Sequence, residues 1–236
     1  MVRGPAAVLV VTAAAWAYFL APKLLPAISN PETSRIVAGT IACVLIVAVA
    51  GGVATLADAA FVVPVILLGG ALVAGAMNAA HVGAAATVPE TVVYACIGIL
   101  FSVLLEAPAL AFAIPIFVAG VDIISVLGAS GHGVAHGLLR GGDPLTLELP
   151  DWHNGLAAAR IGLADVVFAG AYAAFARRME LRFVTSAIGM AIGLAVGLAI
   201  SIAQDAPLPE LAFLGAGFLI PNVDRLVALF RPNPAG

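Results

Sequence analysis

The feature that most constrains this sequence is a series of continuous apolar runs, each about twenty residues long and separated by short polar segments. A run of that length is what an α-helix needs to cross the hydrocarbon core of a bilayer. Strands of a membrane barrel would show alternating hydrophobicity over about ten residues instead. We therefore expect an all-α fold, a polytopic bundle of transmembrane helices.

The composition agrees with a membrane environment. Only 10% of the 236 residues are charged and 63% are hydrophobic, whereas a soluble domain carries about 25% charged residues. The net charge of -3 offers no basic surface for nucleic acid. Cys43 and Cys96 lie in apolar runs without metal-ligand spacing, so they are interpreted as packing residues. We expect an integral membrane protein whose surroundings are lipid.

A hydropathy window of about twenty residues predicts about eight spans, within a range of seven to nine. The predicted helices cover residues 5 to 21, 36 to 57, 60 to 77, 91 to 105, 109 to 127, 158 to 176, 183 to 203 and 208 to 230. The chain divides into N-terminal scaffold helices, 1–106, and a C-terminal part, 107–236, which carries a polar loop at about 128–157.

Basic residues favour an orientation with the N-terminus in the cytoplasm. The strongest signal is a short turn that holds Arg177, Arg178 and Arg182, because short loops beside spans carry most of the orientation information. In the following span, Gly189, Gly193 and Gly197 recur every four residues and predict a face on which a neighbouring helix packs closely.

Two carboxylates lie inside predicted spans, where an ionisable group is costly unless it is paired, hydrated or neutralised. They are Asp122 in the fifth span and Asp165 in the sixth. Arg160 lies less than two turns before Asp165 and is close enough to pair with it. If the two helices pack together, the carboxylates share one proton and can act as acid and base on a peptide bond. A proton or ion relay in a transporter, or structural hydrogen bonding, explains the same residues.

The segments around these aspartates resemble a known family. Asp122 is followed by Ile-Ile-Ser-Val, which is similar to the segment after the first catalytic aspartate of presenilins and their archaeal relatives. Gly162-Leu163-Ala164-Asp165 is similar to the GxGD motif of that family, and the apolar stretch that follows is similar too. The last span opens with Pro207-Leu208-Pro209, which resembles the family's Pro-Ala-Leu motif.

This resemblance, to the presenilin and signal peptide peptidase family of intramembrane aspartyl proteases, implies a function for the chain. A prokaryotic member in the cell membrane would cleave transmembrane segments or signal peptides of other proteins without a metal or cofactor. The residues that would activate water are Asp122 and Asp165. Those that would line the substrate site are Gly162, Leu163, Ala164, Pro207, Leu208 and Pro209.

The chain also departs from the family pattern. Ala164 replaces the second glycine of GxGD, Val121 replaces a common tyrosine, and about eight spans stand where the family has nine. The methyl group of Ala164 would lie near the reacting centre, where it would narrow substrate choice or lower activity.

Two further patterns fall in the polar loop. Gly128-Ala129-Ser130-Gly131 reads as the GxSG of rhomboid serine proteases, which need a histidine from a separate later helix, and no later predicted helix contains one. His132 and His136 have the spacing of a zinc helix, but glycine occupies the place of the glutamate that activates water. A serine protease is therefore the less favoured alternative, and no metal site is predicted.

Overall fold

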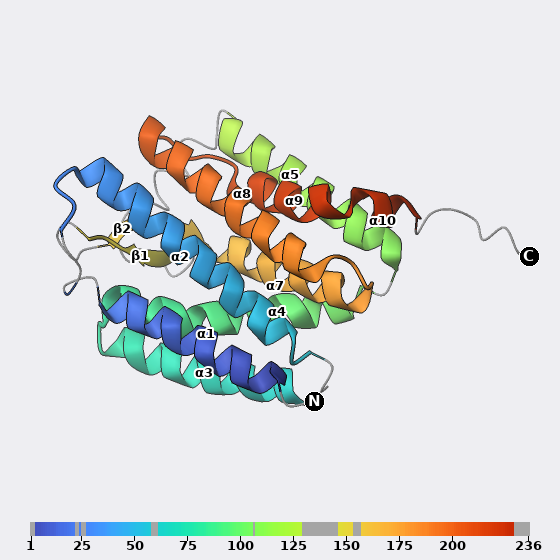
Figure 1. Cartoon of the computed structure of the whole chain (residues 1–236), viewed down its shortest axis with the longest axis horizontal. Coiled ribbons are helices and arrows are strands. Elements are labelled where there is room, and N and C mark those ends of the chain that lie inside the picture. The colour runs from blue at the N-terminus through green and yellow to red at the C-terminus, as the bar shows by residue number, and fades with distance from the viewer. Residues whose placement is uncertain are drawn as a thin grey trace, which may run out of the picture.

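The computed structural model of the chain describes residues 3–21, 24, 27–57, 61–105, 107–128, 146–152 and 157–228. In this part the chain is mostly helical and contains one β-hairpin at one end of the helix bundle (Figure 1). The elements in order are α1 (Arg3–Leu20), α2 (Pro31–Ala54), α3 (Val62–Ala79), η2 (Gly83–Ala86), α4 (Thr87–Val103), α5 (Pro108–Leu127), β1 (Thr146–Pro150), β2 (Ala157–Gly162), α7 (Leu163–Arg178), α8 (Phe183–Gln204), α9 (Glu210–Leu219), η3 (Ile220–Asn222) and α10 (Val223–Ala228).

Six helical segments of the described chain are long and apolar enough to cross a membrane. They are Pro31–Ala54, Val62–Ala79, Gly83–Val103, Pro108–Val126, Phe183–Gln204 and Glu210–Ala228. The apolar part of α1 is shorter, and α7 has 16 residues. The predicted fold class, a bundle of membrane-spanning helices, agrees with the structure, whereas the predicted count of about eight spans is not confirmed.

The outer helices carry their apolar side chains on the surface. Only 11% of the spanning window of α3, and the same share of that of α5, is buried inside the protein. Leu68 and Leu72 on α3, and Phe117 and Ile124 on α5, are each exposed by 67% or more. Side chains of this kind are stable when they contact lipid tails, so the surface fits an integral membrane protein.

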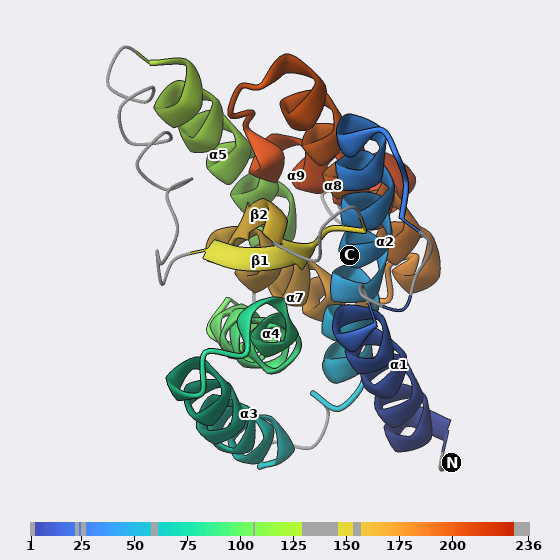
Figure 2. The same cartoon turned by 90° about the vertical axis from the view of Figure 1, so that its left-hand side faces the viewer.

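The helix α7 forms the centre of the bundle, in contact with α2, α4, α8 and α9 (Figures 1 and 2). Its residues from Ala169 to Ala176 are almost completely buried. Most of them are alanine, and two glycines lie where the backbones of α4 and α7 approach: Gly98 on α4 against Val167, and Gly170 on α7 against Ala95. Small side chains allow this contact, because a Cβ atom at either glycine would overlap the backbone of the opposite helix.

The predicted glycine face of α8 is confirmed. A Cβ atom at Gly189 would overlap the carbonyl oxygen of Gly217 on α9, and one at Gly193 would overlap the carbonyl oxygen of Phe213. Gly197 lies against the ring of Phe213. The glycines therefore let α8 and α9 pack backbone to backbone, which fixes the position of α9 in the bundle.

The β-hairpin differs from the sequence prediction. The sixth helix was predicted to begin at residue 158, but β2 continues to Gly162 and α7 begins at Leu163. The two strands are antiparallel, with Thr146 opposite Gly162 and Glu148 opposite Arg160. Alanine favours a helix locally, so the prediction was wrong because pairing with β1 outweighs this preference.

The hairpin is fastened to the helices by buried contacts. Leu147, Leu149 and Ile161 are fully buried. The Ser34 hydroxyl on α2 donates a hydrogen bond of 2.5 Å to Asp151, just beyond β1, and the Thr87 hydroxyl on α4 donates one of 2.7 Å to the Glu148 carbonyl oxygen. These contacts hold the end of β2 in place, and with it the first turn of α7.

The packing of α8 on α9 gives a stability prediction. Gly193→Ala should lower the free energy of unfolding by about 1–3 kcal/mol, because its methyl group would overlap the α9 backbone. The measurement is thermal unfolding of the purified protein in detergent. Gly75→Ala on α3 is the matched control, since nothing lies within 4 Å of its Cβ position. Equal melting temperatures for the two variants would contradict the close packing.

Candidate functional site

A cavity of about 440 Å³ opens where α5, the hairpin, the first turn of α7 and the start of α9 meet. Seven of the eight site residues predicted from the sequence line it: Asp122, Gly162, Leu163, Ala164, Asp165, Pro207 and Leu208. The eighth, Pro209, is the buried N-cap residue of α9 beside the cavity. Residues more than 80 positions apart in the sequence therefore surround one space.

The two aspartates meet in a way that the sequence did not indicate. Direct packing of the two helices that carry them was the expected route. In the structure α5 packs mainly against α9, and α9 also contacts α7. The start of α9 therefore brings Asp122 and Asp165 to the same cavity.

Asp122 caps the N-terminus of α9 from a neighbouring helix. Its Oδ2 atom accepts a hydrogen bond of 2.9 Å from the Leu211 N–H. The first N–H groups of a helix have no partner within the helix, and Pro209 has no side-chain oxygen to offer them. A carboxylate from α5 meets this need and benefits from the positive end of the helix dipole.

Asp165 occupies the third helical position of α7, and only 5% of its surface is exposed. Its carboxyl group accepts hydrogen bonds from the backbone N–H of Gly162, the N-cap residue, and from its own N–H. The reach back to the N-cap is that of a capping box. A Cβ atom at Gly162 would lie 3.0 Å from the Asp165 Oδ2 atom, so the glycine of the motif gives this carboxyl group its space.

Glu210 is a third carboxyl group in the cavity, and the sequence analysis missed it. It is the first residue of α9, and its side chain is hydrogen-bonded to that of Asp165. The sequence does contain a signal for it. Glu210 is an ionisable residue at the start of an apolar span, and, like the two aspartates, such a residue needs a partner or a function.

Arg160 lines the cavity from β2. The sequence suggested that it would pair with Asp165. It forms an ion pair with Glu148 across the hairpin, with 3.3 Å between its Nη2 atom and the Glu148 Oε1 atom. The two residues face each other in the strand register, which explains the pairing.

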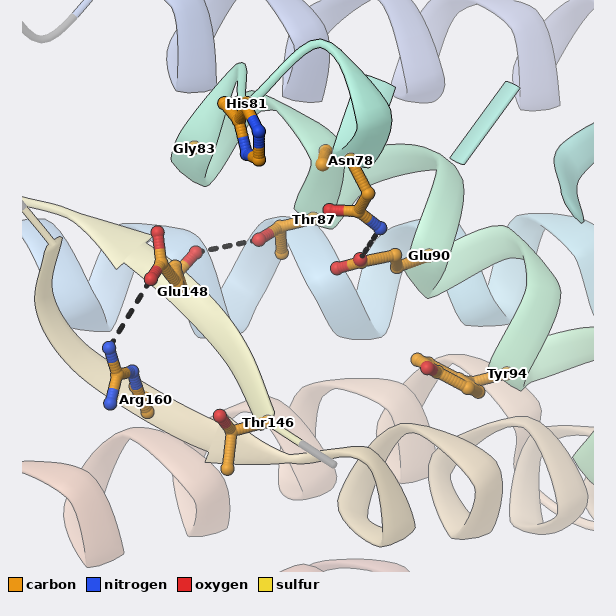
Figure 3. A pocket seen from close by; sticks show the side chains of 10 residues that line it. Asn78, His81, Gly83, Thr87, Glu90, Tyr94, Thr146, Glu148 and Arg160 are labelled. Carbon is orange, nitrogen blue, oxygen red and sulfur yellow. Dashed lines mark hydrogen bonds and ion pairs between the residues drawn. The ribbon is translucent and has the colours of Figure 1, made fainter. Parts of the chain in front are cut away.

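A second cavity of about 510 Å³ lies between the hairpin and the turn that joins α3 to α4 (Figure 3). Its lining is polar: Asn78 donates a hydrogen bond of 2.7 Å to Glu90, and His81 lies above Glu148. Thr146 and Arg160 line both cavities. The two cavities therefore share part of the hairpin as their lining.

The residues of the competing patterns, Ser130, His132 and His136, lie outside the described residues. Within the part of the chain that the structure describes, no group of three or more histidine, cysteine, aspartate or glutamate side chains is arranged to hold a metal ion.

Comparisons with models of protein families, with curated proteins and with solved structures found no match to this chain.

The cap on α9 predicts that two substitutions of Asp122 differ in their effect on stability. Asp122→Leu should lower the free energy of unfolding by about 1 kcal/mol, because the Leu211 N–H loses its acceptor. Asp122→Asn should stay within a few tenths of a kcal/mol of the wild type, because asparagine is an equally good cap. Thermal unfolding in detergent measures both. Equal loss in the two variants would show that the cap contributes nothing to folding.

Proposed function

We propose that this chain is an intramembrane aspartyl protease that hydrolyses peptide bonds in the transmembrane segments or signal peptides of other proteins. The observation that carries the proposal is the meeting of Asp122 and Asp165 in one cavity, within a bundle of membrane-spanning helices. Its support from the sequence is the resemblance to the GxGD proteases. Every segment that carries the resemblance borders the same cavity.

The reaction uses the carboxyl groups as acid and base. An ionised aspartate takes a proton from a water molecule, and the water oxygen attacks the carbonyl carbon of the scissile bond. The carbonyl oxygen receives a proton held by the carboxyl groups of the site. The tetrahedral intermediate then breaks its C–N bond, the departing nitrogen takes up the proton that came from water, and one hydroxyl of the intermediate returns its proton to the carboxyl groups.

The substrate must lose its helical form to expose a peptide bond, and its backbone groups then need new partners in a medium without water. The hairpin beside the cavity offers a solution. A two-stranded sheet has unpaired backbone groups on its outer edges, and an extended segment can add to such an edge. Because β2 runs directly into Leu163 and Asp165, a segment that pairs beside it passes the aspartates.

The proposal includes the membrane and the orientation. The basic side chains Arg177, Arg178, Arg182 and Arg225 lie at the junctions α7–α8 and α9–α10, at the end of the bundle opposite the hairpin. By the positive-inside rule this end faces the cytoplasm of a prokaryotic cell. The N-terminus of α1 lies at the same end (Figure 1), so the N-terminus is cytoplasmic.

The decisive test is cleavage of a transmembrane-helix substrate by the purified protein in detergent. Asp122→Asn and Asp165→Asn should each lower the rate by about a hundredfold or more, because each removes a group that moves a proton. Asp205→Asn, an exposed residue at the end of α8, is the matched control and should keep full activity. Ser130→Ala should also remain active.

If the wild type cleaves no member of a substrate panel, or if cleavage survives in both aspartate variants, the proposal is wrong. Cleavage lost in Ser130→Ala but kept in the aspartate variants would indicate a serine protease instead.

Ala164 gives a second prediction about the same reaction. Its methyl group lines the cavity at the position of the second glycine of GxGD. Ala164→Gly should therefore raise the rate for substrates with large side chains next to the cleaved bond, by about tenfold, with a smaller change for substrates with alanine there. The measurement is a comparison of kcat/KM for paired substrates. An equal change for both would show that Ala164 does not limit substrate size.

A further inference from the structure

Three carboxyl groups gather in the cavity, and the hydrogen bonds around them differ. Asp122 accepts from the backbone N–H of Leu211. Asp165 accepts from two backbone N–H groups. Backbone donors of this kind stabilise a carboxylate in its ionised form, so the surroundings of both aspartates favour the form that can accept a proton.

The contact between Asp165 and Glu210 has a different requirement. Two ionised carboxylates have only acceptor oxygens, so a hydrogen bond between them needs one proton. Asp165 already receives two backbone N–H groups, which favours its ionised form. The proton of the shared hydrogen bond therefore belongs to Glu210, which donates it to Asp165.

We propose that Glu210 is a positioning residue of this site that stores the proton needed for catalysis and donates it in a hydrogen bond to Asp165. This inference rests on the proposed protease function for its role in the reaction. The protonation of the three-carboxyl cluster can be measured without any substrate.

The proton balance of the reaction follows from this starting state. Asp122 takes one proton from water, while the proton of Glu210 passes through Asp165 to the carbonyl oxygen. When the C–N bond breaks, the nitrogen takes the proton from Asp122, and one hydroxyl of the intermediate returns its proton through Asp165 to Glu210. The site ends in the state in which it began, with one proton on Glu210.

Other titratable groups lie near the three carboxyl groups. They are Tyr172 on α7, Arg160 on β2 and Cys43 on α2. The charge of Arg160 is shared with Glu148 through their ion pair. The tyrosine and cysteine are neutral in a buried setting, so the balance of the site is set by the three carboxyl groups.

The pH dependence follows from the number of carboxyl groups. Removing the last proton from three neighbouring carboxyls leaves three negative charges close together, whereas removing it from two leaves only two. The first process costs more Coulomb energy, so the three-group cluster keeps its proton to a higher pH. Glu210→Gln should therefore move the alkaline limit of activity to lower pH by about one unit or more.

The first experiment is the pH profile of kcat for wild type and Glu210→Gln, with Glu32→Gln as the matched control. Glu32 is exposed in the first turn of α2, and its substitution should leave the profile unchanged. Glutamine keeps the length and a hydrogen-bond donor toward Asp165, so a loss of fold alone would not move the alkaline limit. An alkaline limit in Glu210→Gln equal to that of the wild type would overturn the proposal.

The second experiment is infrared titration of the protonated carboxyl C=O band of the same proteins in detergent. The band that the wild type loses as the pH rises should disappear at a lower pH in Glu210→Gln. In Glu32→Gln it should disappear at the same pH as in the wild type. Asp165→Asn removes another member of the cluster and should shift the band in the same direction, which covers a failure of Glu210→Gln to fold. Identical titrations would refute the proton store.

The two experiments separate the proposals. A wild type that cleaves nothing refutes the protease, and the infrared titration still decides the role of Glu210. A wild type that cleaves, with aspartate variants inactive and an unchanged titration in Glu210→Gln, refutes only the role of Glu210.

Discussion

The hydrogen bonds at the N-terminus of α9 are the interaction on which the rest of the site depends. Asp122 caps the helix from α5, and the first helical residue, Glu210, reaches Asp165 on α7. The position of this N-terminus is set on its other side by the glycines of α8, which bring the α9 backbone into direct contact. A shift of α9 would therefore break the cap, separate the carboxyl groups and open the cavity together.

A bilayer makes these contacts matter more than they would in water. Inside a membrane a helix end or a carboxyl group cannot turn to solvent, so each has to find its partner within the protein. The Leu211 N–H at the start of α9 and the carboxylate of Asp122 are hydrogen-bond partners, so each satisfies the other. The same holds for the hairpin, whose buried Asp151 is bound by the Ser34 hydroxyl of α2. Buried polar groups are thus held in place by hydrogen bonds to one another, and these bonds also make the site rigid.

Three carboxyl groups and one arginine around a small cavity are an expensive arrangement for a merely structural purpose. Arg160 is occupied by Glu148, and the carboxyl groups depend on backbone N–H groups and on one another. In a cluster of this kind the carboxylates repel one another, and this repulsion favours keeping a proton in the cluster. Small changes in geometry alter the repulsion, so the cluster can release and recover the proton. This is the property that hydrolysis by paired carboxyls needs, and the second cavity, which shares Thr146 and Arg160 with this one, places polar side chains close to it.

Local composition and spacing predict the membrane-helix class and the close face of Gly189, Gly193 and Gly197, and the resemblance to a known family pointed to seven of the residues that line the cavity. Only the tertiary structure decided that Ala157–Gly162 is a strand, that Arg160 pairs with Glu148, and that Glu210 joins the aspartates. Each of these depends on a partner outside the local sequence window: the neighbouring strand β1 for β2, the strand register for the ion pair, and the packing of α9, a segment far away in the chain, for the third carboxyl. A helix propensity or a charge in a sequence window carries no information about such a partner, because the contact exists only after the segments have packed.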